Sequence, residues 1–202
     1  MSKENFIVVG YYTENTFYEK EAIEVGLSAS NLEIPCYFHD VKDQGNWHKN
    51  TNYKPTFLLE MFEKYKDDYI AIVYVDVDAR FVAYPELFDT LAAVPCPIAV
   101  HNFDRSCYRG GRENGYEILS GTIYLQTLNE TKWILEKWER ECQSHIGTWD
   151  QKNLEKVLKG NYHNLPYQYC MIYDRYKDTE NPVIIHYQAS RKVRSRGGSL
   201  QT

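Results

Sequence analysis

Two aspartates follow directly after an apolar segment in the first half of the chain. Residues 69–75 read Tyr-Ile-Ala-Ile-Val-Tyr-Val, which predicts a strand buried on both faces because no polar residues alternate with the apolar ones. Asp76 and Asp78 come next and would share one side of an extended backbone. Their carboxylates could hold a hard divalent cation, and that cation could hold a diphosphate. The alternative is a solvated turn, since aspartates commonly end strands.

A histidine and several basic residues near the C-terminus form a second chemically notable group. His186 ends an apolar segment, and Lys192 follows six residues later. Arg191 and Arg194 lie beside that lysine, so positive charge is concentrated at this end of the chain. Such a cluster suits a phosphate group. A histidine at a strand end can also be a buried or surface group with no ligand.

Composition excludes several classes of protein. The 202 residues, 43% of them hydrophobic, are enough for one large domain with a core. A net charge of −5 argues against a general nucleic-acid binder. The five cysteines have no Cys-x-x-Cys spacing, which predicts reduced thiols in a cytoplasmic protein. We find no apolar run long enough to span a membrane and no signal-peptide core at the first residues.

The order of the predicted elements is that of an α/β protein. Helical patterns alternate with the first strands, and Pro55 marks the start of the helix that precedes Asp76. Such alternation predicts a mostly parallel central sheet flanked by helices. Residues 102–117, which contain several glycines, are expected to be irregular and could form a lid on the substrate side. The segments predicted as strands are 6–9, 34–38, 69–75, 97–100, 122–125, 167–173 and 183–186.

The order of these motifs resembles that of a known enzyme family. Asp-x-Asp follows an apolar strand, Asp150-Gln151 follows a tryptophan-containing helix, and a histidine is followed after five residues by a lysine. Together the motifs are similar to the GT-A glycosyltransferases, and most of all to the glycogenin-like and lipopolysaccharide galactosyltransferase-like retaining enzymes. The resemblance extends from about Ile7 to Lys192. The size and the basic end are also similar to glycosyltransferase domains encoded by chlorella viruses.

The resemblance implies a single GT-A domain over residues 1–190, a Rossmann-like fold that binds nucleoside diphosphate sugars. Residues 1–101 would bind the nucleotide sugar, 102–190 would form the acceptor side, and 191–202 would be a basic, flexible tail. The implied reaction moves a hexosyl group from a donor, expected to be a UDP-hexose, to a hydroxyl of a glycan or glycoprotein, with retention of configuration. The protein would act in the cytoplasm, or in the host cytoplasm if a virus encodes it. A larger multidomain protein that contains this chain is compatible with the resemblance.

The resemblance also assigns roles to individual residues. The implied ligands of Mn²⁺ or Mg²⁺ are Asp76, Asp78 and His186. An imidazole among oxygen ligands favours Mn²⁺. Lys192, assisted by Arg191 or Arg194, would neutralise the β-phosphate of the donor. In the family a glycine usually stands three residues after the histidine, whereas this chain has Ala189 in the turn that leads to Lys192.

Residues near the nucleotide follow from the same resemblance. Tyr11, Tyr12 and Thr13 come after the first strand, where the family holds the base, so that an aromatic ring could stack on uracil. Ordinary packing is the alternative for each of them. Lys54 precedes the helix that leads to Asp76, where similar enzymes place a basic residue against donor phosphate or an acidic partner. A solvated lysine is the alternative there.

Asp150 and Gln151 match the Asp-Gln pair that the family places beside the anomeric carbon. Gln151 would offer its carbonyl near the developing oxocarbenium ion, and Asp150 would bind a sugar hydroxyl. In an inverting enzyme Asp150 would instead be the general base. Capping of a helix is the structural alternative for Asp150. Trp149 and Trp47 could stack on sugar faces or be part of the core.

Two other functions fit part of this pattern. A nucleotidyltransferase also places carboxylates and metal at strand ends, but it normally carries a glycine-rich basic loop after its first strand, and residues 10–14 are not such a loop. A non-catalytic module that binds nucleotide sugars would keep the fold without the reaction. Hydrolysis of the donor in the presence of Mn²⁺ would distinguish an enzyme from such a module.

Overall fold

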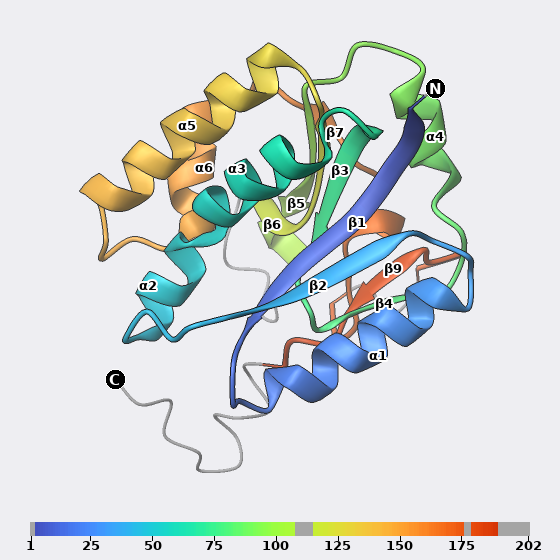
Figure 1. The fold of residues 1–202 in the computed structure, drawn as a ribbon, viewed down its shortest axis with the longest axis horizontal. Coiled ribbons are helices and arrows are strands. Elements are labelled where there is room, and N and C mark those ends of the chain that lie inside the picture. The colour runs from blue at the N-terminus through green and yellow to red at the C-terminus, as the bar shows by residue number, and fades with distance from the viewer. Residues whose placement is uncertain (1–2, 108–114, 176–178, 190–202) are drawn as a thin grey trace.

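The computed structural model describes residues 3–107, 115–175 and 179–189. In these residues a six-stranded sheet is covered by helices on both faces, and a smaller sheet packs beside it (Figure 1). The larger sheet consists of β1 (Glu4–Thr13), β2 (Cys36–Val41), β3 (Tyr69–Val75), β5 (Ile98–Asp104), β6 (Tyr116–Gln126) and β7 (His163–Asn164). The smaller sheet consists of β4 (Ala79–Phe81), β8 (Met171–Ile172) and β9 (Ile184–His186). The helices are α1 (Tyr18–Ser30), α2 (Trp47–Asn52), α3 (Lys54–Tyr65), α4 (Glu86–Ala92), α5 (Asn129–Ser144) and α6 (Asp150–Leu158), with 3₁₀ turns η1 (Arg105–Cys107) and η2 (Tyr167–Tyr169).

The strand order of the larger sheet is β2-β1-β3-β6-β5-β7, and that of the smaller sheet is β4-β9-β8. β1 pairs in parallel with both β2 and β3, and β5 pairs in parallel with β7. Only β6 runs antiparallel to its neighbours in the larger sheet as described, β3 and β5. The predicted fold class, α/β with a mostly parallel central sheet flanked by helices, is confirmed.

β3 is the central strand, and its two faces belong to two different parts of the core. Val73 and Val75 pack with α1, α4 and the smaller sheet. Ile72 and Tyr74 pack with α3, α5 and α6, which lie together at the upper left in Figure 1. Because both faces are covered, the strand can be apolar throughout, as the sequence predicted. The strand ends at Val75, and the side chain of the next residue, Asp76, is 41% exposed.

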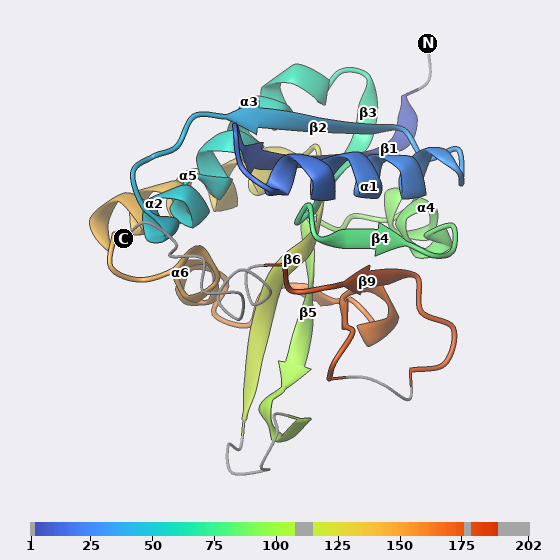
Figure 2. The ribbon, with the colours of Figure 1, turned by 90° about the horizontal axis from the view of Figure 1, so that it is seen from below.

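The chain between β5 and β6 differs from the prediction. Residues 102–117 were expected to be irregular, but β5 continues to Asp104 and β6 begins at Tyr116, and these two residues pair with each other. Figure 2 shows the two strands extending past the smaller sheet. The register shifts between Val100 and His101, so a β-bulge bends the ladder and lets it continue. The expectation of a long irregular lid was therefore wrong for both ends of this segment, and its centre, 108–114, lies outside the described residues.

The expected strand over residues 167–173 was also wrong. This segment forms η2 and then only the short strand β8. The 3₁₀ turn buries the Tyr169 ring, and the Tyr169 hydroxyl accepts a hydrogen bond of 3.0 Å from the backbone N–H of Leu87 near the start of α4. A contact between distant segments thus outweighs the strand propensity of the tyrosines.

The two predicted functional halves share one sheet. β1, β2 and β3 come from residues 1–101, β6 and β7 come from 102–190, and β5 crosses the expected boundary. The division into halves stays a prediction about function. Among the described residues, no helix is both long enough and apolar enough to cross a membrane.

The position of Gly10 between β2 and β3 yields a prediction about stability. A Cβ at Gly10 would lie 2.6 Å from the Val75 carbonyl oxygen and 2.8 Å from Phe38 Cε1. We therefore expect Gly10→Ala to lower the free energy of unfolding by about 1–3 kcal/mol, measured by urea denaturation. Gly26→Ala is the matched control, because its Cβ has no neighbour closer than 3.8 Å and lies in α1, where alanine should add about 0.5–1 kcal/mol. Equal effects of the two substitutions would contradict the packing described here.

Candidate active site

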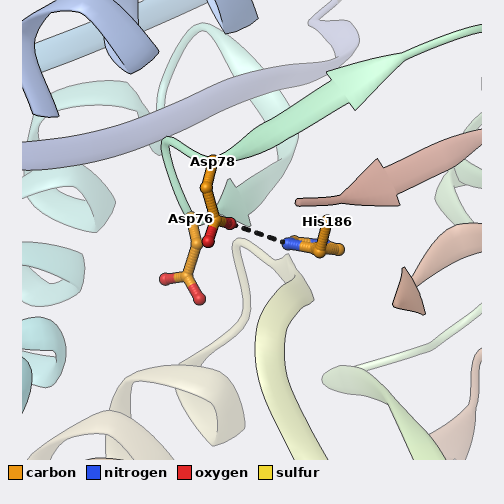
Figure 3. A group of neighbouring side chains, drawn as sticks. All are labelled: Asp76, Asp78 and His186. Carbon is orange, nitrogen blue, oxygen red and sulfur yellow. Dashed lines mark hydrogen bonds and ion pairs between the residues drawn. The ribbon is translucent and has the colours of Figure 1, made fainter. Parts of the chain in front are cut away.

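Three side chains that can bind a metal ion come together at the carboxyl end of β3 (Figure 3). Asp76 follows β3, Asp78 lies in the turn into β4, and His186 ends β9. One potential ligand atom from each of them lies within 4.8 Å of the others. β4 pairs with β9, and this pairing sets His186 opposite Ala79. The smaller sheet thus brings a residue from near the end of the chain beside the two aspartates.

Hydrogen bonds fix the orientation of the His186 ring, which is 2% exposed. Its Nε2 atom lies 2.8 Å from the hydroxyl oxygen of Thr122, and its Nδ1 atom lies 3.4 Å from Asp78 Oδ1. The other oxygen of Asp78 accepts a 2.9 Å hydrogen bond from the backbone N–H of Ala189. Because Nε2 is held by Thr122, Nδ1 is the ring atom that faces the carboxylates.

The protonation of these groups reflects their mutual charges. Burial alone would lower the pKa of His186, but Cys170 and the Asp78 carboxylate outweigh it and raise the pKa to about 10. Burial would raise the pKa of Asp78, but His186 holds it below its usual value. Withdrawal from water raises the pKa of Asp76, and the Lys54 ammonium opposes that shift. A divalent cation would take the place of the imidazole proton, because a ligating imidazole is neutral.

The site also has the shape that a bound ion requires. Asp76 Oδ2, Asp78 Oδ1 and His186 Nδ1 are the potential ligand atoms, and a bound ion would replace the 3.4 Å contact between Asp78 Oδ1 and His186 Nδ1. A Cβ at Gly121 would lie 3.3 Å from both Asp76 Oδ2 and His186 Nδ1, so a larger residue would intrude on these atoms. Two carboxylates and an imidazole are ligands that suit a divalent cation of the Mn²⁺ type. The residues present therefore fit a metal ion.

Lys54 connects this cluster to the predicted Asp-Gln pair. The side chain of Lys54 is 5% exposed, and its ammonium lies 3.2 Å from Asp76 Oδ1 and 3.0 Å from Asp150 Oδ2. It also donates to the Ser120 carbonyl oxygen at 3.0 Å and lies over the Tyr74 ring, 4.7 Å from its centroid. Burial would lower the pKa of Lys54, but the two carboxylates outweigh it and raise the pKa. Lys54 therefore has acidic partners, one of the two environments expected for it, and the solvated alternative is wrong.

Asp150 and Gln151 lie at the start of α6, against β6. Ser120 Oγ donates a 2.9 Å hydrogen bond to Asp150 Oδ2, and the backbone N–H of Ser120 lies 3.4 Å from Gln151 Oε1. The indole N–H of Trp138 donates to the Asp150 carbonyl oxygen at 2.9 Å. The residue before the helix is Trp149, and no side chain caps this end of α6. Asp150 is thus held in place by Lys54 and Ser120, and the capping alternative is wrong.

The three residues at the end of β1 have different surroundings. Tyr11 packs its ring 5.1 Å from Phe57 and 6.1 Å from Tyr74, and its hydroxyl donates to the Asn50 carbonyl oxygen at 2.7 Å. Burial raises the pKa of Tyr11. Tyr12 is half-buried against the opposite layer of the core, and the Thr13 carbonyl accepts a 2.6 Å hydrogen bond from Thr16. Packing explains the Tyr11 ring, and contact of this segment with a base stays a prediction.

The structure describes some, but not all, of the remaining residues that were predicted to belong to the site. Trp149 is 46% exposed, and the Trp47 ring meets it edge-on with centroids 6.1 Å apart. Lys192 and Arg191 lie outside the described residues. Two contacts in the site were not predicted. Thr122 contacts His186, and Asp76 Oδ1 accepts a 2.8 Å hydrogen bond from the Tyr74 hydroxyl. The one available signal was a polar side chain inside an otherwise apolar strand.

Comparisons with known proteins identify the fold. No protein-family model matches the sequence, and no curated protein matches it. A glycosyltransferase involved in the glycosylation of the major capsid of PBCV-1 has a similar structure, with a TM-score of 0.66 and 14% identity over 96% of this chain and 98% of that chain. The galactosyltransferase LgtC, solved with donor and acceptor sugar analogs, gives a TM-score of 0.56 and 13% identity over 96% of each chain.

The glycosyltransferase GlyE of Streptococcus pneumoniae TIGR4 gives a TM-score of 0.58 and 16% identity over 92% of this chain. This chain spans 55% of the GlyE chain. At these identities the similarity concerns the fold. The chain has the GT-A-type glycosyltransferase fold, which confirms the resemblance seen in the sequence at the level of structure.

The charge network around Lys54 yields a second prediction. Lys54→Met leaves two carboxylates without their cation, and we expect it to lower the free energy of unfolding by about 3–5 kcal/mol. Adding Asp150→Asn should restore part of this loss, because one unpaired carboxylate is removed, and a double-mutant cycle measures the coupling. Lys132→Met is the control. It breaks a 2.6 Å pair with Glu63 that is exposed to solvent, and the expected loss is below about 1 kcal/mol. Equal losses for the two lysines would contradict the prediction.

Proposed function

We propose that this protein is a metal-dependent glycosyltransferase that transfers a hexosyl group from a UDP-hexose to a hydroxyl of a glycan or glycoprotein, with retention of configuration. The observation that carries the proposal is the cluster of Asp76, Asp78 and His186 at the carboxyl end of β3 in a glycosyltransferase fold. Ligands of open α/β sheets bind beyond the carboxyl ends of the strands. The domain proposed for this activity is residues 1–190, and its proposed location is the cytoplasm.

Asp76, Asp78 and His186 would hold Mn²⁺ or Mg²⁺, with Mn²⁺ favoured by the imidazole ligand. When bound, the metal supplies a Lewis acid that stabilises negative charge on the leaving diphosphate. The spacing of Lys192 and Arg191 after the histidine supports a role for both in binding the diphosphate. The segment from Tyr11 to Thr13 is proposed to bind the base.

Asp150 and Gln151 are the residues proposed to act on the sugar. Lys54 and Ser120 both occupy Asp150 Oδ2, which leaves Oδ1 to accept a hydrogen bond from a sugar hydroxyl. Lys54 binds both Asp150 and Asp76, so it holds the sugar-binding carboxylate at a fixed place relative to the metal ligands. Such fixed placement lowers the reorganisation needed in the transition state. Gln151 would offer a carbonyl dipole to the developing cation.

The metal site yields the prediction that tests this function. We expect UDP with Mn²⁺ to raise the melting temperature by about 5–10 °C at a UDP concentration near 100 times Kd, and UDP with EDTA to leave it unchanged. Asp78→Ala should abolish both the shift and the release of UDP from UDP-glucose and UDP-galactose, while the variant stays folded. Asp67→Ala, an exposed aspartate outside the site, is the control and should behave as the unaltered protein. Equal UDP binding in EDTA and in Mn²⁺ would exclude the proposed metal role.

The stereochemistry of transfer yields a further prediction. If configuration is retained, the leaving phosphate takes the acceptor proton and no strong protein base is needed. Gln151→Ala should then lower kcat moderately, and Asp150→Asn should mainly raise KM for the donor. If configuration is inverted, Asp150→Asn should lower kcat by about 10²–10⁴-fold, because a positioned base is lost. Proton NMR of the first product decides between the two, and an inverted anomeric centre rejects the retaining mechanism.

A further inference from the structure

The turn that carries Asp78, between β3 and β4, has a hydrogen bond to each of its backbone carbonyls. The backbone N–H of Ala79 donates to the Asp76 carbonyl oxygen at 2.9 Å. The Asp78 carbonyl oxygen accepts a 3.0 Å hydrogen bond from the backbone N–H of Tyr187. The remaining two carbonyls, those of Val77 and Ala79, lie on either side of Asp78 in the chain, and one side chain binds both of them.

That side chain is Arg80, the middle residue of β4. Its Nη1 atom donates to the Ala79 carbonyl oxygen at 2.7 Å and to the Val77 carbonyl oxygen at 3.3 Å. Its Nη2 atom donates to Glu21 Oε2 at 2.5 Å, and Nη1 also lies 3.4 Å from the Glu21 carbonyl oxygen. The side chains of Arg80 and Glu21 are only 18% and 17% exposed. The guanidinium therefore connects the two carbonyls that flank Asp78 to α1.

The helix α1 supports this connection because it is packed firmly onto the core. The buried residues of its inner face are Ala22, Val25 and Ala29. Ser28 Oγ accepts a 3.0 Å hydrogen bond from the backbone N–H of Phe81, so α1 also binds β4 directly, and Figure 2 shows the two elements side by side. Through Glu21, the guanidinium thus holds the turn at a defined place relative to the core.

The contacts of Arg80 depend on the shape of its side chain and not only on its charge. A guanidinium is planar and directs its N–H groups in fixed directions, so it can bind two carbonyls and a carboxylate at once. The ammonium of a lysine, a point charge on a flexible stem, does not reproduce this arrangement. The positive charge by itself would oppose a cation bound at Asp78, because like charges repel. Positioning and charge therefore predict opposite effects of Arg80 on metal affinity.

We infer that Arg80 is a positioning residue for the metal ligand Asp78, and that Glu21 holds Arg80 in place. By binding the carbonyls before and after Asp78, the guanidinium restricts the rotation of both peptide groups, and so it sets the direction in which the carboxylate points. The backbone N–H of Ala189 then fixes one carboxylate oxygen at 2.9 Å. The inference rests on the proposed metal-dependent function and adds to it a contact outside the cluster of ligands.

The affinity for Mn²⁺, measured without donor or acceptor by electron paramagnetic resonance of the free ion and by calorimetry, tests this role. We expect Arg80→Lys and Arg80→Met each to weaken Mn²⁺ binding about ten- to a hundredfold, as is common when a group that orients a metal ligand is removed. Glu21→Ala, which keeps the guanidinium but removes its anchor, should weaken it about three- to tenfold. Near-UV circular dichroism checks that each variant is folded, and Glu21→Ala decides the question if the Arg80 variants do not fold.

Ser28→Ala is the matched control, because it removes a contact between α1 and β4 but none with the turn, and it should leave the Mn²⁺ affinity unchanged. A second measurement needs no metal. The amides of Ala79 and Tyr187 close the turn, so their hydrogen exchange in Arg80→Lys should become about ten times faster, beyond any change in the amides of β3. A loss of overall stability alone would not produce this local difference.

The inference is overturned if the Arg80 and Glu21 variants bind Mn²⁺ as tightly as the unaltered protein, or if exchange at Ala79 and Tyr187 is unchanged. It is also overturned if Arg80→Met binds Mn²⁺ more tightly while Arg80→Lys is unaffected, which is the result expected of charge alone. Binding of Mn²⁺ that does not depend on Arg80 rejects only the positioning role. An unaltered protein that binds no Mn²⁺ rejects the proposed metal site, and this role with it.

Discussion

A buried ammonium between two carboxylates is the interaction on which the candidate site depends. Lys54 is almost fully removed from water, and a buried charge is costly unless it is paired and hydrogen-bonded. Asp76 and Asp150 provide that pairing, and Ser120 provides a hydrogen bond. These four residues come from α3, the end of β3, α6 and β6, so the charge network requires all four elements to meet at one point.

The same network determines which atoms remain available for chemistry. Tyr74 and Lys54 engage one oxygen of Asp76, and the other oxygen lies toward His186. Thr122 engages one nitrogen of His186 and leaves Nδ1 directed toward the aspartates. In each side chain of the proposed metal site, a hydrogen bond to one polar atom thus determines that the other polar atom is the potential ligand. Orientation of this kind commonly increases the affinity of a metal site.

The backbone of β6 provides the surface on which the network assembles. A Cβ at Gly121 would lie 3.3 Å from ligand atoms of both Asp76 and His186, so a side chain there would crowd the proposed metal site. The neighbouring residues Ser120 and Thr122 bind Asp150 and His186, respectively.

The sequence by itself determined the central strand. An apolar segment without alternating polar residues indicates a strand that is buried on both faces, and this inference does not depend on which distant residues pack against the strand. It also indicated Asp76, Asp78 and His186 through the order of motifs. Only the tertiary structure decided the partners of Lys54, the hydrogen bond between Thr122 and His186, and the strand ladder that continues beyond residue 102. The physical reason is that these features are contacts between segments far apart in the chain. Periodicity and propensity are local, so they predict elements, whereas the pairing of charges and strands depends on how those elements pack.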